Sequence, residues 1–146
     1  RPVGEELAVL NDASTSWPAP DDNGRARHAH FRGYRLDASG APTFRYTVQG
    51  VEVEDAIRPA GHLAEATDAL VRTISLHAAA PVDGLHFRLA SGQPGERGPD
   101  GSWRLGGTLT ATIEGGGSPV SRDGQLVVPV TFENGRARLV VTYRWL

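Results

Sequence analysis

Apolar and polar residues alternate with a period of two along most of the chain, which predicts β-strands rather than helices. The clearest example is the C-terminal segment GQLVVPVTFENGRARLVVTYRWL, residues 124–146. If Asn134-Gly135 forms the type I′ turn that this pair favours, the segment becomes a β-hairpin with one apolar face. The register would then pair Phe132 with Ala137, Val130 with Leu139, Val128 with Val141, and Leu126 with Tyr143.

The segment HAHFRGYRLDASGAPTFRYTVQGVEVEDAIRP, residues 28–59, predicts a second antiparallel unit. A strand from Ala29 to Leu36 precedes the turn residues 37–40, and Pro42 opens the next strand. Gly33 interrupts the first strand, which is typical of a β-bulge or a close backbone approach. With Gln49-Gly50 as the next turn, the register pairs Val48 with Val51, Tyr46 with Val53, Arg45 with Glu54, and Thr47 with Glu52.

Three further strands follow from apolar residues at alternate positions. Their apolar faces are Leu70, Ile74 and Leu76; Leu85, Phe87 and Leu89; and Leu109, Ala111 and Ile113. One stretch differs, because Leu63, Ala66 and Leu70 have helical spacing and predict a short helix within residues 62–70. The segments 11–23 and 91–102 contain turn-forming residues and predict long loops, where function usually resides.

These elements predict an all-β domain of about eight or more short antiparallel strands. Such strands bury two apolar faces against each other or close on themselves, so we expect a β-sandwich, with a β-barrel as the alternative. A chain of 146 residues has the size of a single domain. We expect residues 1–26 to form an extended N-terminal segment and residues 27–146 to form the β core.

Composition then narrows the functional classes. The formal net charge is −2 and the 15 basic residues, all Arg, are scattered, which argues against nucleic acid or an anionic membrane as a partner. With no Cys, Lys or Met, the chain lacks thiolate and thioether ligands, thiol nucleophiles, covalent c-type haem attachment and Schiff-base chemistry. No apolar run is long enough to span a membrane. Because the chain begins with Arg1, we expect a processed product or part of a longer protein.

Several polar residues suggest chemistry without completing a site. His28 and His30 point to the same side of a strand, as two zinc or copper ligands would, but the sequence nominates no further ligand beyond the isolated His62, His77 and His86 and several nearby acids. The alternative is a half-exposed polar strand face. Glu52 and Glu54 share a strand face opposite Arg45, which favours an ion-paired surface over catalytic carboxylates. Serines occur only in turn contexts, so we predict no catalytic residue.

Aromatic side chains offer another kind of binding site. Trp17, Trp103, Trp145, Tyr34 and Tyr46 offer flat faces that could stack against a sugar ring, with polar side chains such as Arg32 around them. Trp17 and Trp103 lie in or beside the predicted long loops, where we expect such a site. The alternative is structural, with each tryptophan, Trp145 included, plugging an end of the sandwich. A sugar-binding groove would hold two coplanar rings with polar side chains around them.

The sequence carries the pattern F-x-G-Y-x-L, then P-x-F-x-Y-x-x-x-G-V, closing on Y-R-W. Its residues here are Phe31, Gly33, Tyr34, Leu36, Pro42, Phe44, Tyr46, Gly50, Val51, Tyr143, Arg144 and Trp145. From about Arg27 onward, the chain resembles the C-terminal β-rich region of large secreted proteins in planctomycete-type bacteria. Those proteins are similar to sorbosone or glucose dehydrogenase-like quinoproteins and often carry a c-type cytochrome domain.

The resemblance implies association with redox proteins but transfers no catalytic residue, since this chain has neither a propeller nor a C-x-x-C-H motif. We expect no cofactor in this chain, and a haem or quinone would belong to a partner chain. The favoured hypothesis is a non-catalytic subunit or processed fragment of a larger periplasmic or extracellular redox assembly, marked by an exposed apolar or strand-edge surface. A carbohydrate-binding module is the alternative, and an independent enzyme is the third.

Overall fold

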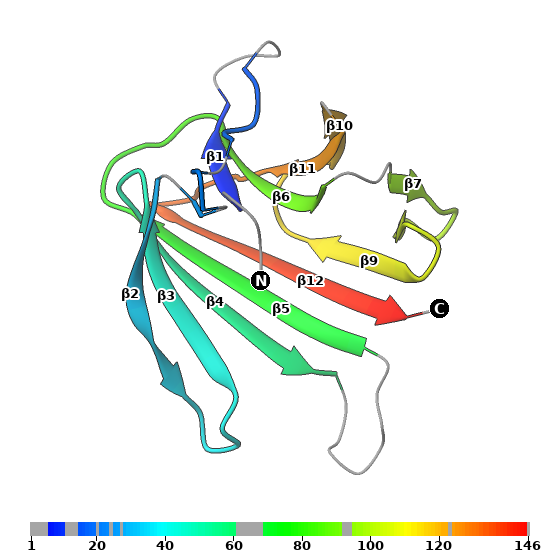
Figure 1. The fold of residues 1–146 in the computed structure, drawn as a ribbon, viewed down its shortest axis with the longest axis horizontal. Helices are drawn as coiled ribbons and strands as arrows, with labels where there is room; N and C mark the ends of the chain where they lie inside the picture. The colour runs from blue at the N-terminus through cyan, green and yellow to red at the C-terminus, as the bar shows by residue number, and fades with distance from the viewer. Residues whose placement is uncertain are drawn as a thin grey trace.

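The computed structural model describes residues 6–10, 15–19, 21–23, 25–26, 28–60, 69–91, 95–122 and 124–145. Within these residues the chain forms β-strands and no helix. The strands make two antiparallel sheets, one of four strands and one of eight (Figure 1). The fold is therefore the predicted β-sandwich, and in this part of the chain the two sheets keep separate edges instead of closing into one.

The strands of the smaller sheet lie in the order β1 (Leu7–Val9), β6 (Leu85–Ser91), β11 (Gln125–Pro129), β10 (Val120–Arg122). Those of the larger sheet lie in the order β2 (Ala29–Leu36), β3 (Pro42–Val48), β4 (Val51–Pro59), β5 (Ala69–Ala78), β12 (Arg136–Trp145), β9 (Leu109–Glu114), β8 (Trp103–Leu105), β7 (Gly95–Arg97). The predicted N-terminal extension thus contributes β1, and the predicted loop at 91–102 contains β7.

The hydrophobic core lies between the two sheets. The predicted apolar faces of β5 and β6 are confirmed, since Ile74 and Phe87 are both fully buried there. Ala111 of β9 is also fully buried, and its neighbours Leu109 and Ile113 pack against the core. Alternating residues from both sheets therefore meet in one cluster, which is how a sandwich removes apolar surface from water.

The β3–β4 hairpin has the predicted register. Val48 lies opposite Val51, and the pairing continues in step to Arg45 opposite Glu54. Gln49 and Gly50 have φ angles of 47° and 81°, the left-handed values that a type I′ turn requires. Local turn chemistry and the apolar alternation agree at this hairpin, so its register could be read directly from the sequence.

Strand β2 has the predicted bounds and a bulge at the predicted glycine. Its register against β3 shifts between Phe31 and Gly33, so that Arg32 is the extra residue. Gly33 has a φ of 132°, a conformation that residues with a side chain rarely adopt. The bulge bends the outermost strand of the larger sheet, and the bulged residue Arg32 lies on the outer side of that sheet.

The predicted C-terminal hairpin is wrong beyond its turn. Asn134 and Gly135 do have positive φ angles, and Glu133 bridges Arg136 as expected. Beyond that bridge the arms separate, because β11 pairs with β6 in the smaller sheet while β12 pairs with β5 in the larger one. Residues such as Val128 and Leu139 are buried, but they meet across the sandwich rather than side by side. Stacking two apolar faces buries more of each than pairing them edge to edge.

The short helix expected within residues 62–70 falls mostly outside the described residues. Leu63 and Ala66 belong to that undescribed stretch, and Leu70 lies in β5.

The Asp21 turn is described, and the Asp21 carboxylate accepts hydrogen bonds from the amides of Asn23 and Arg25 at 2.9 and 2.8 Å. This is the arrangement of a turn closed by an aspartate side chain.

A buried ionic cluster ties the two sheets together at one end of the core. Arg72 of β5 donates from Nε to Asp55 Oδ1 of β4 at 2.9 Å, and its Nη2 bonds both Asp55 and Glu6, the residue before β1. The guanidinium also lies 5.3 Å from the ring centre of Phe87. Burial alone would lower the pKa of Arg72, but the bonds and charges of the two carboxylates outweigh it and raise that pKa.

We expect Asp55→Ala to lower the free energy of unfolding by about 3–5 kcal/mol, because it leaves the buried Arg72 without its main partner. The matched control is Glu52→Ala on the same strand, where the carboxylate points to solvent, and we expect a change below about 0.5 kcal/mol. Urea unfolding of the two variants checks this. Equal small losses would show that the cluster does not hold the sheets together.

Candidate docking surface

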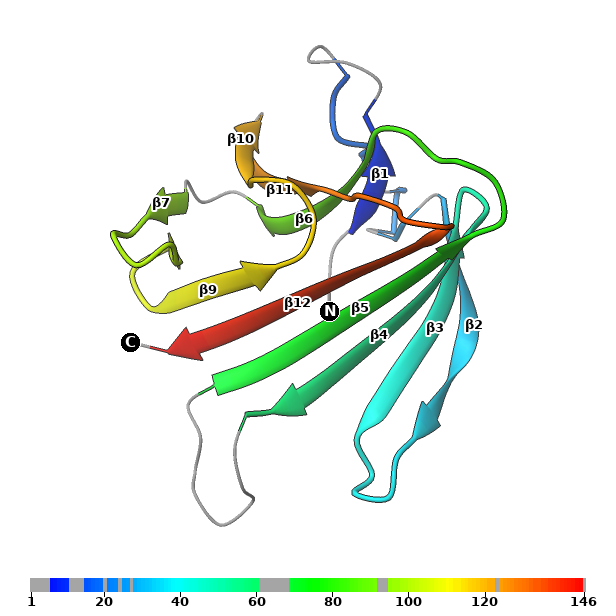
Figure 2. The same cartoon turned by 180° about the vertical axis from the view of Figure 1, so that it is seen from behind.

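The smaller sheet covers only part of the larger one. Figures 1 and 2 both show β1, β6, β10 and β11 over one end of the eight-stranded sheet, with the far ends of β2–β5 extending beyond them. Burial follows this geometry along the inner face of β4, where exposure rises from 0% at Val51 to 37% at Ile57. On β3 it rises from 1% at Val48 to 37% at Phe44. The inner face thus passes from core to surface along each strand.

A group of large apolar side chains occupies this uncovered region. The residues are on the inner face because Tyr34 pairs with Phe44, and Phe44 pairs with the buried Asp55. We call this group the open face. Its members are Phe31 (66% exposed), Tyr34 (62%), Leu36 (59%), Phe44 (37%) and Ile57 (37%). Contiguous apolar surface of this kind is typical of interaction sites in soluble proteins.

Two of the aromatic rings of the open face lie close together. The ring centres of Tyr34 and Phe44 lie 6.3 Å apart, with their planes tilted by 49°. This tilted arrangement is favourable for two aromatic rings but does not form a flat platform. It suits packing against irregular protein side chains better than stacking along one sugar ring.

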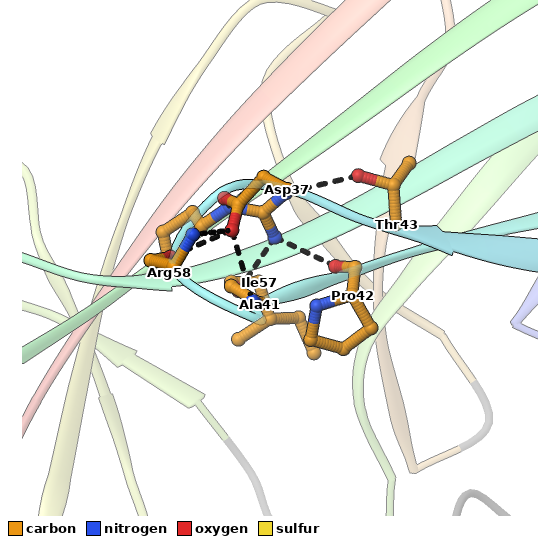
Figure 3. Close-up of polar contacts among 7 residues, drawn as sticks. Asp37, Ala41, Pro42, Thr43, Ile57 and Arg58 are labelled. Carbon is orange, nitrogen blue, oxygen red and sulfur yellow. Dashed lines mark hydrogen bonds and ion pairs between the residues drawn. The ribbon is translucent and has the colours of Figure 1, made fainter.

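The hairpin that carries the open face is braced from its tip. Figure 3 shows Arg58 of β4 reaching the β2–β3 turn. Its Nε lies 2.9 Å from Asp37 Oδ2, and its Nη atoms donate to the Pro42 carbonyl at 2.6 Å and to Thr43 Oγ1 at 3.0 Å. One guanidinium therefore joins β4 to β3 and to the turn that follows β2, which limits independent movement of β2.

Asp37 organises the turn itself. Its Oδ1 accepts hydrogen bonds from the Ser39 hydroxyl at 2.6 Å, from the Ser39 amide at 2.9 Å and from the Ala41 amide at 3.0 Å. These bonds, the Ser39 hydroxyl first and the Ala41 amide next, lower the pKa of Asp37 from 3.8 to about 2, with help from the charge of Arg58. The hydrogen bonds of the turn therefore stabilise the ionised form of the Asp37 side chain.

The opposite, outer face of the same strands is polar. It holds a shallow cavity of about 630 Å³ whose lining includes the charged residues Arg32, Arg45, Arg136, Glu52 and Glu54, together with His77. The predicted ion-paired character is confirmed, but Glu54 bonds Arg35 of β2 at 2.9 Å rather than the expected Arg45. That hydrogen bond is the main reason that the pKa of Glu54 is lowered. Oε2 of Glu52 lies 3.6 Å from Nδ1 of His77 on β5.

The four predicted ligand-binding residues lie at separate places. Tyr34 belongs to the open face, whereas Arg32 of the same strand lines the outer cavity. The guanidinium of Arg88 lies over the ring of Trp17, 5.6 Å from the ring centre. Arg88 is on β6 of the smaller sheet. Trp103, on β8, packs against the core. The structure therefore does not bring Trp17 and Trp103 into one described cavity, and the open face was not among the predicted sites.

His28 and His30 are both exposed at the start of β2. Among the residues that the structure describes, no three His, Asp or Glu side chains gather as a metal site requires. A metal at these two histidines stays a prediction, and His62, which the sequence also offers, lies outside the described residues.

Comparisons with protein-family models, with curated proteins and with solved structures gave no match. Across the described ranges, no helix has the length and apolar character needed to cross a membrane. Function must therefore be inferred from the surface that these residues build.

We expect Phe31 and Phe87 to respond very differently to the same substitution. Phe87→Ala removes a fully buried ring and should cost about 3–5 kcal/mol of unfolding free energy. Phe31 is 66% exposed, so Phe31→Ala should cost less than about 1 kcal/mol. Chemical denaturation measures both values. A large cost at Phe31 would mean that its side chain is covered in the isolated chain, and the open face would not exist.

The Asp37 turn should depend on pH in a defined window. Because the folded pKa of about 2 lies below the usual 3.8, the contribution to stability is fully present above pH 3.8 and is lost as the pH falls through about 2. Carboxyl NMR should give an Asp37 midpoint near pH 2, and Ser39→Ala should raise that midpoint. A wild-type midpoint at the usual value would contradict the turn contacts.

Proposed function

We propose that this chain is a non-catalytic β-sandwich subunit or fragment of a larger assembly, held to a partner protein through the open face. The observation that carries the proposal is the exposure of Phe31, Tyr34 and Leu36 on the same face that is buried elsewhere in the sheet. Single exposed apolar residues are common, but a connected group on one sheet face is not. A partner that covers this group would complete the sandwich.

The energetics favour such an association. Fully burying one Leu or Phe side chain is worth about 1.5–3 kcal/mol, and three members of the open face are more than half exposed. Their combined burial is large enough to offset part of the entropy that association loses. The brace from Arg58 to Asp37 keeps the surface ordered before binding, which reduces the ordering cost further.

The shifted pKa values also fit a structural role. Those of Arg72 and Tyr143 belong to groups around the buried ionic cluster, where burial raises the pKa of Tyr143. The pKa shifts of Asp37 and Asp100 arise from hydrogen bonds within turns. Catalytic sites usually combine shifted groups in a cleft, whereas these shifts arise from burial at Tyr143, from the carboxylate partners of Arg72 and from turn hydrogen bonds at Asp37 and Asp100.

The partner class that we propose is a periplasmic or extracellular redox protein carrying a haem or a quinone. The support is the resemblance of the segment from Phe31 to Val51 and of the terminal Tyr143-Arg144-Trp145 to regions of quinoprotein and c-type cytochrome chains. Much of that segment forms β2 and β3, the strands that carry most of the open face. Carbohydrate binding remains the second candidate, supported by the exposed ring of Tyr34.

The test is native mass spectrometry and absorbance spectroscopy of the tagged chain purified from its own source. We expect a complex with a larger partner that carries haem or quinone. Leu36→Asp, which places a charge in the open face, should release that partner because the interface would bury an unpaired carboxylate. Thr112→Asp, at an exposed site on β9, is the matched control and should retain it.

A lone chain without a chromophore would contradict the redox assembly. Loss of the partner in both variants, or in neither, would contradict docking at the open face. If the lone chain instead binds oligosaccharides, and Tyr34→Ala abolishes that binding, the carbohydrate hypothesis replaces the docking proposal.

A further inference from the structure

Strand β2 is the one long edge among the described strands. The sheets end at β1, β10, β7 and β2, and the first three have three residues each whereas β2 has eight. Proteins commonly keep edge strands short because an exposed edge offers unpaired amides and carbonyls to other chains. In the described part of the chain β2 pairs only with β3, so its outer edge can accept another strand.

The two faces of β2 differ sharply in chemistry. On the inner side it presents Phe31, Tyr34 and Leu36 of the open face. On the outer side it presents His30 and the two arginines Arg32 and Arg35. The strand contains no carboxylate. A strand that matches both faces would have apolar residues on one side and acidic residues on the other.

The surroundings of β2 strengthen this charge pattern. Arg45 of β3 lies opposite Gly33 and lines the outer cavity with Arg32. Within the described residues Arg32 forms no salt bridge, Arg35 is held by Glu54, and the charge of Arg45 also acts on Glu54. Arg35 and Arg45 therefore share one carboxylate, and Arg32 adds a positive charge at the edge that has no ion-pair partner among the described residues.

A second copy of this chain fits the edge poorly. Antiparallel pairing of two β2 strands that keeps both apolar faces together sets Phe31 against Tyr34 and His30 against Arg35. Arg32 of each copy would then lie opposite Gly33 of the other, which makes the two Arg32 side chains diagonal neighbours at the centre of the outer face. Like charges this close destabilise a strand pair, so the charge pattern disfavours a symmetric dimer and favours a different, acidic partner.

The outer face of β2 is open at its centre. A side chain added at Gly33 would meet no atom within 4 Å, so the described residues leave space there for the side chains of a partner. The bulge bends β2 at this point, and an added strand must follow the same bend.

We propose that β2 binds an extended segment of its partner as an additional strand, and that this segment alternates apolar with acidic residues. The apolar residues would extend the open face and the acidic residues would face Arg32 and Arg35. This inference rests on the proposed docking function and deepens it by naming the chemistry of the partner segment. Strand addition of this kind gives affinity through main-chain hydrogen bonds and specificity through alternate side chains.

The test uses three short synthetic peptides with the purified chain. The first alternates valine and glutamate, the second replaces every glutamate with lysine, and the third is the first peptide with alternate backbone amides methylated. We expect the glutamate peptide to shift the NMR amide signals of β2, with binding that weakens as salt rises. The lysine peptide should bind at least about tenfold more weakly, because it sets like charges together. The methylated peptide should lose binding, because it cannot complete a strand ladder.

Charge reversal on the protein supplies the matched variants. Arg32→Glu should lower the affinity for the glutamate peptide by about tenfold and raise the affinity for the lysine peptide. Arg104→Glu, at an exposed position on β8 at the other side of the sheet, should leave both affinities unchanged. A glutamate peptide that shifts no β2 signal, a lysine peptide that binds equally well, or a dimer formed through β2 would each overturn the inference.

These outcomes are separable from the docking proposal itself. If the peptides fail but Leu36→Asp still releases the natural partner, only strand addition at β2 is wrong. If Leu36→Asp also retains the partner, the docking function falls with it.

Discussion

The structure depends on a mismatch between its two sheets. Four strands, two of them only three residues long, face a sheet of eight, so the smaller sheet cannot cover the inner face of the larger one. Where it does, Ile74, Phe87 and Leu139 form a close-packed core. Beyond it the same alternating pattern continues into solvent as the open face. One geometric constraint therefore produces both the stable core and the exposed apolar surface.

Polar contacts border the open face at both of its ends. The cluster of Arg72, Asp55 and Glu6 closes the covered region and links β1 to β4 and β5. Asp55 lies opposite Phe44, so the cluster directly adjoins the open face. On the far side, Arg58 fixes the β2–β3 turn through Asp37. The open face is thus anchored at both ends, which favours a preorganised docking surface over a loose hairpin.

The sequence predicted the elements better than their assembly. The β3–β4 register and the Gly33 bulge depend on local turn chemistry, and both were readable. The Asn134-Gly135 turn was readable for the same reason, but its arms enter different sheets, because distant core packing decides where β11 and β12 pair. Simple alternation would place Phe31 and Tyr34 on opposite faces, and only the bulge at Gly33 brings them to the same one; nor does the pattern show whether another layer covers them. The open face could be recognised only once the extent of the smaller sheet was known, and neither the tryptophans nor the histidine pair indicated it.

The central claim is that the inner face of β2 and β3 is exposed in the isolated chain and covered in its natural assembly. Hydrogen–deuterium exchange of the isolated chain and of the purified complex tests this most directly. The account predicts fast exchange in the isolated chain at the β2 amides that do not bond β3, with new protection in the complex at residues 29–36 and 42–48 and none at β9. Protection that appears only elsewhere, or edge amides of β2 already protected in the isolated chain, would contradict it.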